Sequence, residues 1–237
     1  GGTGSIVAGL ERLLKELNVE ILLNSPVEEI LLEGGRASGV RLEGGTTMNA
    51  DFVVANADPS TVYRNMVPAS VRKKNTDKRI DRMRQSMSLF VIYFGAKKTY
   101  EDLAHHTIYL GPRYKELLHD VFEKKTLSDD FSLYLHAPTR SDASMAPPGH
   151  ECFYVLSPVP NQASGLNWEE HAEPYKERIL NYLNDNHLPG LVENLVTCKT
   201  VDPRYFENNM RSFKGAAFGP EPRLTQSAYF RYHNESE

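Results

Sequence analysis

The sequence predicts a protein of mixed α and β structure in two parts, the second inserted into the first. Residues 1–58 read as a helix followed by short strands, and the composition changes at about Pro59. The region 59–209 then alternates helices with strands rich in Tyr and Phe, as an α+β module does. The predicted fold class is therefore α/β for the first part and α+β, on a mostly antiparallel sheet, for the insertion.

The first part begins with an amphipathic helix. Apolar residues recur at helical spacing between residues 5 and 17 and give the helix one apolar face, and Asn18 is a suitable residue to end it. The glycine pairs at 34–35 and 44–45 predict turns. Strands are expected at 19–23, 27–33, 37–42 and 50–55.

The strand at 50–55 runs into Asn56, Ala57 and Asp58. An apolar strand that ends in small residues and Asn can bring backbone close to a ligand. The alternative is a plain turn into a helix with Asp58 as the N-cap, and the local sequence favours this second interpretation.

The inserted part holds five expected strands. The most apolar of them reads SLFVIYFG, and the strands are placed at 88–95, 103–110, 132–137, 152–158 and 195–201. Helices are expected at 113–125, 169–183 and 203–209, and 213–224 is expected to be a loop. The basic run at 70–84 is interpreted as a solvated helix face, with contact to an anionic membrane or partner as the alternative.

The expected helix at 113–125 has two interpretations. Its apolar stripe is flanked by lysines and an arginine, a pattern that can lie in a membrane interface. Packing against the protein's own sheet is the other interpretation. The stripe consists of Tyr114, Leu117, Leu118, Val121 and Phe122.

The composition limits the function classes. The 237 residues are 40% hydrophobic and 24% charged with a formal net charge of −4, which gives no electrostatic basis for binding nucleic acid. Cys152 and Cys198 lie far apart without CxxC spacing, which argues against a zinc site or disulfide scaffold and fits a reducing cytoplasm. No apolar run approaches the roughly 20 residues of a membrane span, so we expect no spanning segment.

The sequence contains no self-contained catalytic constellation. His105 and His106 are adjacent in an expected strand, where neighbouring side chains point to opposite faces, so we predict no metal site there or elsewhere. GxSxG and HExxH motifs are absent from the sequence. Either a cofactor supplies the chemistry or the catalytic residues lie outside this chain. The chain starts at Gly1 within a motif and ends in a polar stretch, and we interpret it as a piece of a longer protein.

Six strings of residues, in order from Gly1 to Asn234, resemble the bacterial-type phytoene desaturases, a group of amine-oxidase-like FAD flavoproteins. The strings are GGTGSIVAGLERLLKEL, VVANAD, SLFVIYFG, LAHHTIYLGPRYKELL, DFSLYLHAPT and LTQSAYFRYHN. The resemblance implies FAD-dependent desaturation of phytoene towards lycopene. It also implies that 1–58 and 210–237 are parts of a Rossmann-like FAD-binding domain and that 59–209 is a substrate-binding and membrane-associating domain.

The resemblance assigns candidate residues. For the flavin it implies the backbone at Val27 and the turn at Asn56 and Ala57. Because the family's GxGxxG segment would precede Gly1 and its glycine-rich flavin segment would follow Glu237, we expect this chain alone neither to retain FAD nor to turn over. Aromatic positions together with the resemblance give the candidates for lining a polyene tunnel, which are Phe90, Tyr93, Tyr134, His136 and Phe218. Catalytic residues are not assigned.

The implied partners are phytoene, a membrane surface, and quinone or oxygen as electron acceptor, with no nucleic acid. The implied location is cytoplasmic and peripherally membrane-associated, and the resemblance now gives the helix at 113–125 support as the membrane contact. Alternatives on the same scaffold are a carotenoid isomerase and a C30 or later-step desaturase. An alternative of another class is a non-catalytic carotenoid- or lipid-binding module.

Overall fold

The computed structural model describes residues 2–235, so Gly1 and Glu237, the two ends considered above, lie outside it. The first part contains helix α1 (Gly4–Glu16) and an antiparallel three-stranded sheet. The sheet consists of β1 (Val27–Glu33), β2 (Arg36–Leu42) and β3 (Thr47–Asn49). Gly34 and Gly35 have φ values of +58° and +81°, as a two-residue hairpin turn requires. The expected helix, the expected strands at 27–33 and 37–42, and both glycine turns are confirmed.

Two predicted strands of the first part are wrong. Residues 19–23 and 50–55 have no strand structure, because a strand exists only when its backbone groups pair with a neighbour and neither segment has one among the described residues. Their apolar side chains are left uncovered, with Phe52 81% and Val54 91% exposed. The apolar stripe of α1 is likewise exposed, with Ile6 at 65% and Leu17 at 64%.

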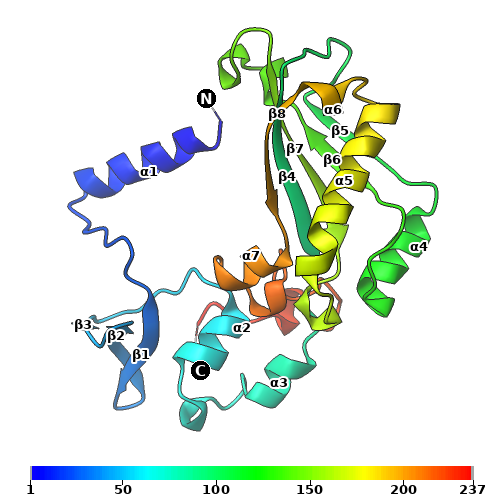
Figure 1. Cartoon of the computed structure of the whole chain (residues 1–237). Helices are drawn as coiled ribbons and strands as arrows, with labels where there is room; N and C mark the ends of the chain where they lie inside the picture. The colour runs from blue at the N-terminus through cyan, green and yellow to red at the C-terminus, as the bar shows by residue number, and fades with distance from the viewer. Residues whose placement is uncertain (1, 236–237) are drawn as a thin grey trace.

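The second part is built on an antiparallel five-stranded sheet, as the sequence predicts. In spatial order its strands are β5 (His106–Tyr109), β6 (Leu133–His136), β7 (Glu151–Val159), β4 (Ser88–Ala96) and β8 (Leu195–Val201). The helices are α2 (Pro59–Thr61), α3 (Asp77–Arg82), α4 (Tyr114–His119), α5 (Trp168–Asn186), α6 (Leu191–Asn194) and α7 (Pro203–Asn208). Figure 1 shows α5 lying along one side of this sheet.

The main hydrophobic core lies between that side of the sheet and α5. Every second residue of β4 points into it, and Phe90 and Ile92 are fully buried there. The Phe90 ring stacks on Trp168 at 5.6 Å and meets Tyr175 edge-on at 5.0 Å. The other face of β4 is buried at Leu89 and Val91 and exposed at Tyr93, so that face of the sheet is uncovered only in part.

The C-terminal segment packs on the region 60–87. Tyr232 is buried beside Tyr63, with ring centroids 5.6 Å apart, and its hydroxyl lies 3.1 Å from Ser60 Oγ. The backbone of 217–221 pairs with that of 84–87 just before β4. These contacts join the C-terminal segment to residues 60–87. The domain boundaries at 59 and 210 stay a prediction.

The stripe of the expected helix at 113–125 packs mainly against the protein itself. Leu117 is 1% and Val121 4% exposed, and the helix continues from α4 into a π-helical turn over Asp120–Lys124. Within residues 2–235, no helix combines the length and the apolar character that crossing a bilayer requires.

Asp58 begins α2 as its N-cap, which confirms the interpretation favoured by the sequence. Its Oδ1 accepts a hydrogen bond of 2.9 Å from the amide of Thr61. Burial raises the pKa of Asp58 above its usual value, while hydrogen bonds from Thr61, Ser60 and Phe213 oppose that rise. Burial therefore disfavours the ionised carboxylate of Asp58. The stabilising contribution to the helix comes from the side-chain oxygen that accepts the hydrogen bond of the Thr61 amide.

We expect Asp58→Ala to lower the free energy of unfolding by about 1 kcal/mol, because the Thr61 amide loses its acceptor. Asp58→Asn keeps an accepting oxygen without the buried charge, and we expect it to lower the free energy of unfolding by less than Asp58→Ala does. Urea unfolding followed by circular dichroism gives both values. Equal losses in the two variants would show that the charge, rather than the capping oxygen, stabilises the helix.

Candidate functional site

The candidate site is the face of the five-stranded sheet turned away from α5, here called the open face. We define it by Tyr93, His106, Ile108, Tyr134, His136, Tyr154 and Leu156, which the strand register places on one side. Directly opposite residues of antiparallel strands share a face, so His106, His136, Tyr154 and Tyr93 form one row across four strands. At about 4.8 Å per strand this row is roughly 14 Å long.

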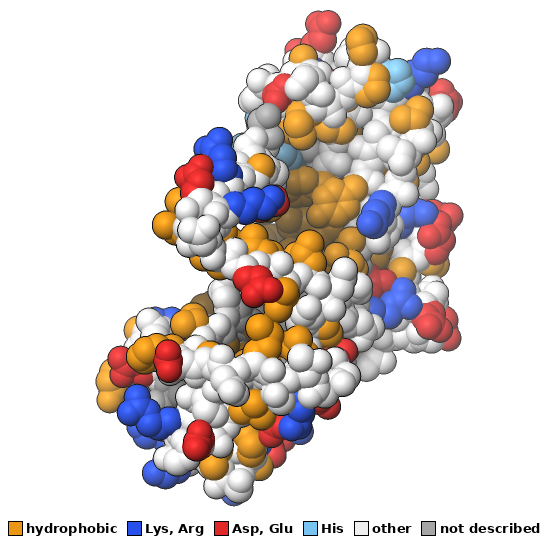
Figure 2. Space-filling model, turned by 90° about the vertical axis from the view of Figure 1, so that its left-hand side faces the viewer, with side chains coloured by type: hydrophobic (Ala, Val, Ile, Leu, Met, Phe, Trp, Pro, Cys, Tyr) orange, Lys and Arg blue, Asp and Glu red, His pale blue; other side chains and the backbone are white. Residues whose placement is uncertain are grey.

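The side chains of the open face form a continuous aromatic surface. Tyr154 lies at its centre, with its ring centroid 5.8 Å from that of Tyr93, 5.7 Å from Tyr134 and 4.7 Å from His136. Tyr93 is 48% and Ile108 67% exposed, so the surface is available to a ligand. Figure 2 looks onto this side of the molecule and shows a hollow lined with hydrophobic side chains.

The titratable groups at the centre of the open face are held uncharged. Burial, and then the neighbouring His105 and His106, lower the pKa of His136 below its usual value. Burial, and then the hydrogen bond with Tyr134, raise the pKa of Tyr154. At neutral pH His136 is therefore a neutral imidazole and Tyr154 a neutral phenol. Lys199 of β8 provides a positive charge at the end of the row, opposite Tyr93.

Three of the five predicted substrate residues meet on the open face, namely Tyr93, Tyr134 and His136. Phe90 is separate from the open face, because it is three residues from Tyr93 in one strand and so points to the opposite face, where it is fully buried. Its role as a substrate residue stays a prediction. Phe218 is 64% exposed and lies beside the residues that precede β4, where its amide donates to Ser86 Oγ at 3.0 Å. Phe218 is not part of the row of side chains across the open face, and its role as a substrate residue stays a prediction.

The expectation that His105 and His106 point apart is also wrong. His105 precedes β5 instead of lying in it, so strand alternation does not apply to the pair. Its carbonyl accepts from the Ala137 amide at 2.8 Å, and its ring centroid lies 4.3 Å from that of His106 and 4.7 Å from that of His136. All three histidines gather at the β5–β6 side of the open face.

The sequence interpretation missed four members of this face, which are Tyr154, Leu156, Ile108 and His106. The signal was present for Tyr154, because CFYVLSP alternates and places Tyr154 on the other side of the strand from Phe153 and Val155. Which of the two sides is covered by a helix is set by α5, and no local pattern in the strand specifies it. The placement of Ile108 and His106 on the open face follows only from the pairing of β5 with β6.

The residues suggested for the flavin do not by themselves fit an FAD site. Val27 opens β1 and is paired with Leu42, while Asn56 and Ala57 are exposed in a segment without strand structure. Phe52 and Val54, just before them, are also uncovered. A nucleotide held here would need further chain to enclose it, because a cofactor pocket buries most of its ligand.

Comparison with known proteins gives the context for these observations. The family model for flavin-containing amine oxidoreductases matches residues 1–229. A lycopene-forming phytoene desaturase from Pseudescherichia vulneris is 43% identical over 99% of this chain and 48% of its own length. A neurosporene-forming phytoene desaturase from Rhodobacter capsulatus is 42% identical over 100% of this chain and 46% of its own length.

A solved structure shows a similar fold. An oxidoreductase from Methanosarcina mazei superposes with a TM-score of 0.57 at 20% sequence identity, over 82% of this chain and 41% of that chain. This chain spans about half the length of the curated relatives it matches. The family model covers nearly the whole sequence, and the chain belongs to the family of flavin-containing amine oxidoreductases.

Proposed function

We propose that the whole protein is an FAD-dependent desaturase that converts phytoene towards lycopene, with this chain supplying the substrate-binding sheet and part of the flavin domain. Two relatives that are 42–43% identical over nearly all of this chain are named phytoene desaturases. The observation that carries the proposal is the open face, an exposed, apolar and aromatic surface whose central groups are neutral.

The open face suits a long apolar ligand for physical reasons. Covering Tyr93, Ile108 and Leu156 removes apolar surface from water, which is favourable at about 25 cal/mol per Å². The tyrosine rings offer π-faces to a polyene chain, and no buried charge has to be desolvated beside Tyr154. These features support phytoene as substrate and support a carotenoid isomerase or a C30 or later-step desaturase equally. The names of the relatives favour phytoene.

The test is turnover by the whole protein. It is incubated with FAD, phytoene-loaded liposomes and a quinone or oxygen as the proposed electron acceptor, and visible absorption is followed. We expect a long-wavelength polyene spectrum whose peaks report the number of double bonds added. FAD binding without a spectral change would contradict desaturation and favour isomerisation or another substrate. Absence of FAD binding would favour a non-catalytic carotenoid- or lipid-binding module.

We expect the 237-residue chain alone to lose FAD during gel filtration, because Asn56 and Ala57 lie uncovered. The absorbance of the protein peak at flavin wavelengths, compared with that of the whole protein, gives the FAD content. Retention of one FAD per chain would contradict this expectation.

We also propose that the protein lies at a cytoplasmic membrane surface and takes its substrate from there. Since Leu117 and Val121 are buried, the apolar contact is proposed to come from Leu110 and Tyr114, which are 63% and 42% exposed and lie outside the residues that define the open face. Basic side chains flank this patch, as they do in many interfacial segments.

We expect Leu110→Lys to reduce binding of the whole protein to phospholipid vesicles about 3-fold or more, because an ammonium group replaces apolar surface that would enter the interface. Co-flotation with vesicles measures the bound fraction. Val192→Lys is the matched control, because Val192 is 47% exposed on α6. Equal binding of both variants and the unaltered protein would rule out this patch as the contact.

A further inference from the structure

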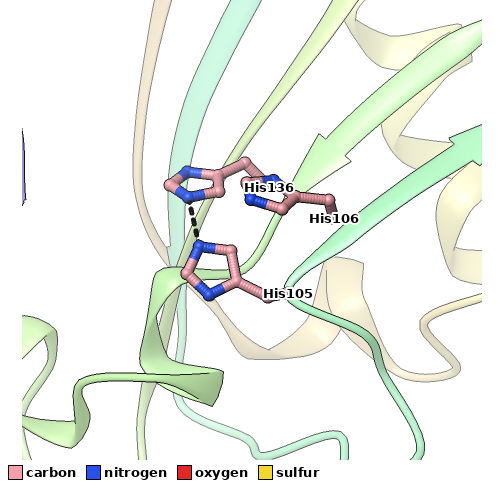
Figure 3. A group of neighbouring side chains, drawn as sticks. All are labelled: His105, His106 and His136. Atoms are coloured by element: carbon pink, nitrogen blue, oxygen red, sulfur yellow. Dashed lines mark hydrogen bonds between the residues drawn. The ribbon is translucent and has the colours of Figure 1, made fainter.

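We propose that His105, His106 and His136 form a binding site for one divalent transition-metal ion of the zinc class at the β5–β6 side of the open face. Each of the three side chains offers a ring nitrogen, and these atoms all lie within 4.8 Å of one another. Figure 3 shows the three rings gathered in one place, two from neighbouring strands and one from the residue just before β5. Among residues 2–235, this is the one group of three or more His, Cys, Asp or Glu side chains with that spacing.

The distances match what a zinc site needs after small ring movements. Zinc binds imidazole nitrogen at about 2.0–2.1 Å in a tetrahedral arrangement, which puts two ligand nitrogens roughly 3.3 Å apart. The Nε2 atoms of His105 and His136 are 2.8 Å apart. In the present structure one of these nitrogens donates a hydrogen bond to the other. In the metal-bound form both Nε2 lone pairs face the ion and both rings carry their proton on Nδ1. Nδ1 of His105 has Ser141 Oγ beside it, whereas Nδ1 of His136 is buried without a hydrogen-bond partner in this structure.

Two of the rings already have the outer hydrogen-bond partners that metal-binding histidines use. Nδ1 of His105 lies 2.6 Å from Ser141 Oγ, and Nδ1 of His106 lies 2.7 Å from Tyr134 OH. Where Nδ1 donates this hydrogen bond to the hydroxyl oxygen, Nε2 is left free for an ion, and the bond orients the ring.

The backbone holds the three residues in place. His106 and His136 are directly opposite in the β5–β6 ladder, and the carbonyl of His105 is tied to the Ala137 amide at 2.8 Å. Sites built on paired strands keep their geometry better than sites on loops.

The ligand set selects the kind of ion. Three imidazoles without a carboxylate suit Zn²⁺, Co²⁺, Ni²⁺ or Cu²⁺, and they do not suit Mg²⁺ or Ca²⁺, which prefer oxygen. Three protein ligands also leave one position of a tetrahedral ion open. The site adjoins the open face, since the ring of Tyr154 lies 4.7 Å from that of His136. The inference goes beyond the proposed desaturase and does not depend on it. A bound ion would bring positive charge beside Tyr154, so we expect the ion and an apolar ligand to compete for this end of the open face.

The test uses Co²⁺ as a visible probe and Zn²⁺ as a competitor on the 237-residue chain, produced without a histidine tag and stripped with a chelator. We expect one equivalent of Co²⁺ to give the d–d absorption of a tetrahedral site and Zn²⁺ to abolish it. His106→Gln and His136→Gln should each weaken binding about 100-fold. Tyr134→Phe removes the outer partner of His106, and with it the hydrogen bond from Tyr154 OH, while it leaves all three rings in place. It should weaken binding about 10-fold.

His171→Gln is the matched control, because His171 is an exposed histidine on α5, away from the cluster. It should bind Co²⁺ as the unaltered chain does. His106 is exposed, so His106→Gln is expected to fold, and circular dichroism checks each variant. If the unaltered chain shows no tetrahedral Co²⁺ band, the proposal is overturned. It is overturned equally if the folded His106→Gln variant binds Co²⁺ as tightly as the unaltered chain.

Discussion

Replacing Phe90 with alanine is expected to lower the free energy of unfolding by about 3–5 kcal/mol, the usual cost of removing a buried aromatic ring from a packed core. The Phe90 ring is fully buried between Trp168 and Tyr175. Tyr93, three residues along the same strand, is 48% exposed. We therefore expect Tyr93→Ala to cost about 1 kcal/mol or less.

Urea unfolding of both variants followed by far-ultraviolet circular dichroism gives the comparison. The pair tests which face of the sheet is the core and which is the open face. Similar losses for the two variants, or the larger loss for Tyr93→Ala, would contradict the assignment of the two faces.

Placing a charge at Tyr93 is expected to impair substrate turnover while leaving the fold intact. A polyene that covers the open face would bury the ammonium group of a Tyr93→Lys variant without a partner, and such desolvation is costly. We expect kcat/KM of the whole protein to fall about 100-fold, which corresponds to ~2.7 kcal/mol. Steady-state turnover of phytoene in liposomes measures this loss.

Val192→Lys again serves as the control, because it adds the same charge at a position of similar exposure on α6. Its turnover should equal that of the unaltered protein. A Tyr93→Lys variant with unchanged kcat/KM and normal thermal unfolding would show that the substrate does not contact this part of the sheet.

The strands of the inserted part could be predicted because their signal is local. The run SLFVIYFG and the alternation in CFYVLSP each specify a strand without knowledge of the rest of the chain, and the structure has β4 and β7 at those places. The hairpin at Gly34 and Gly35 is equally local, because both residues need positive φ.

The errors have a common physical cause, which is dependence on partners far along the chain. The apolar segments at 19–23 and 50–55 have strand character, but a strand needs neighbours, and the described residues supply none. Period-two alternation separates Phe90 from Tyr93, yet only the position of α5 decides which of them is covered. The gathering of His105, His106 and His136 likewise depends on the register of β5 with β6, which the sequence does not display.

The most direct test of the central claim, that the open face holds the apolar substrate, is site-specific photo-crosslinking. The photoreactive residue p-benzoylphenylalanine is placed at Tyr93 or at Val192 of the whole protein, which is irradiated with phytoene-loaded liposomes and analysed by mass spectrometry. We expect a phytoene adduct at position 93 and none at position 192. Equal adducts at both positions, or none at 93 while the protein still turns over phytoene, would contradict the claim.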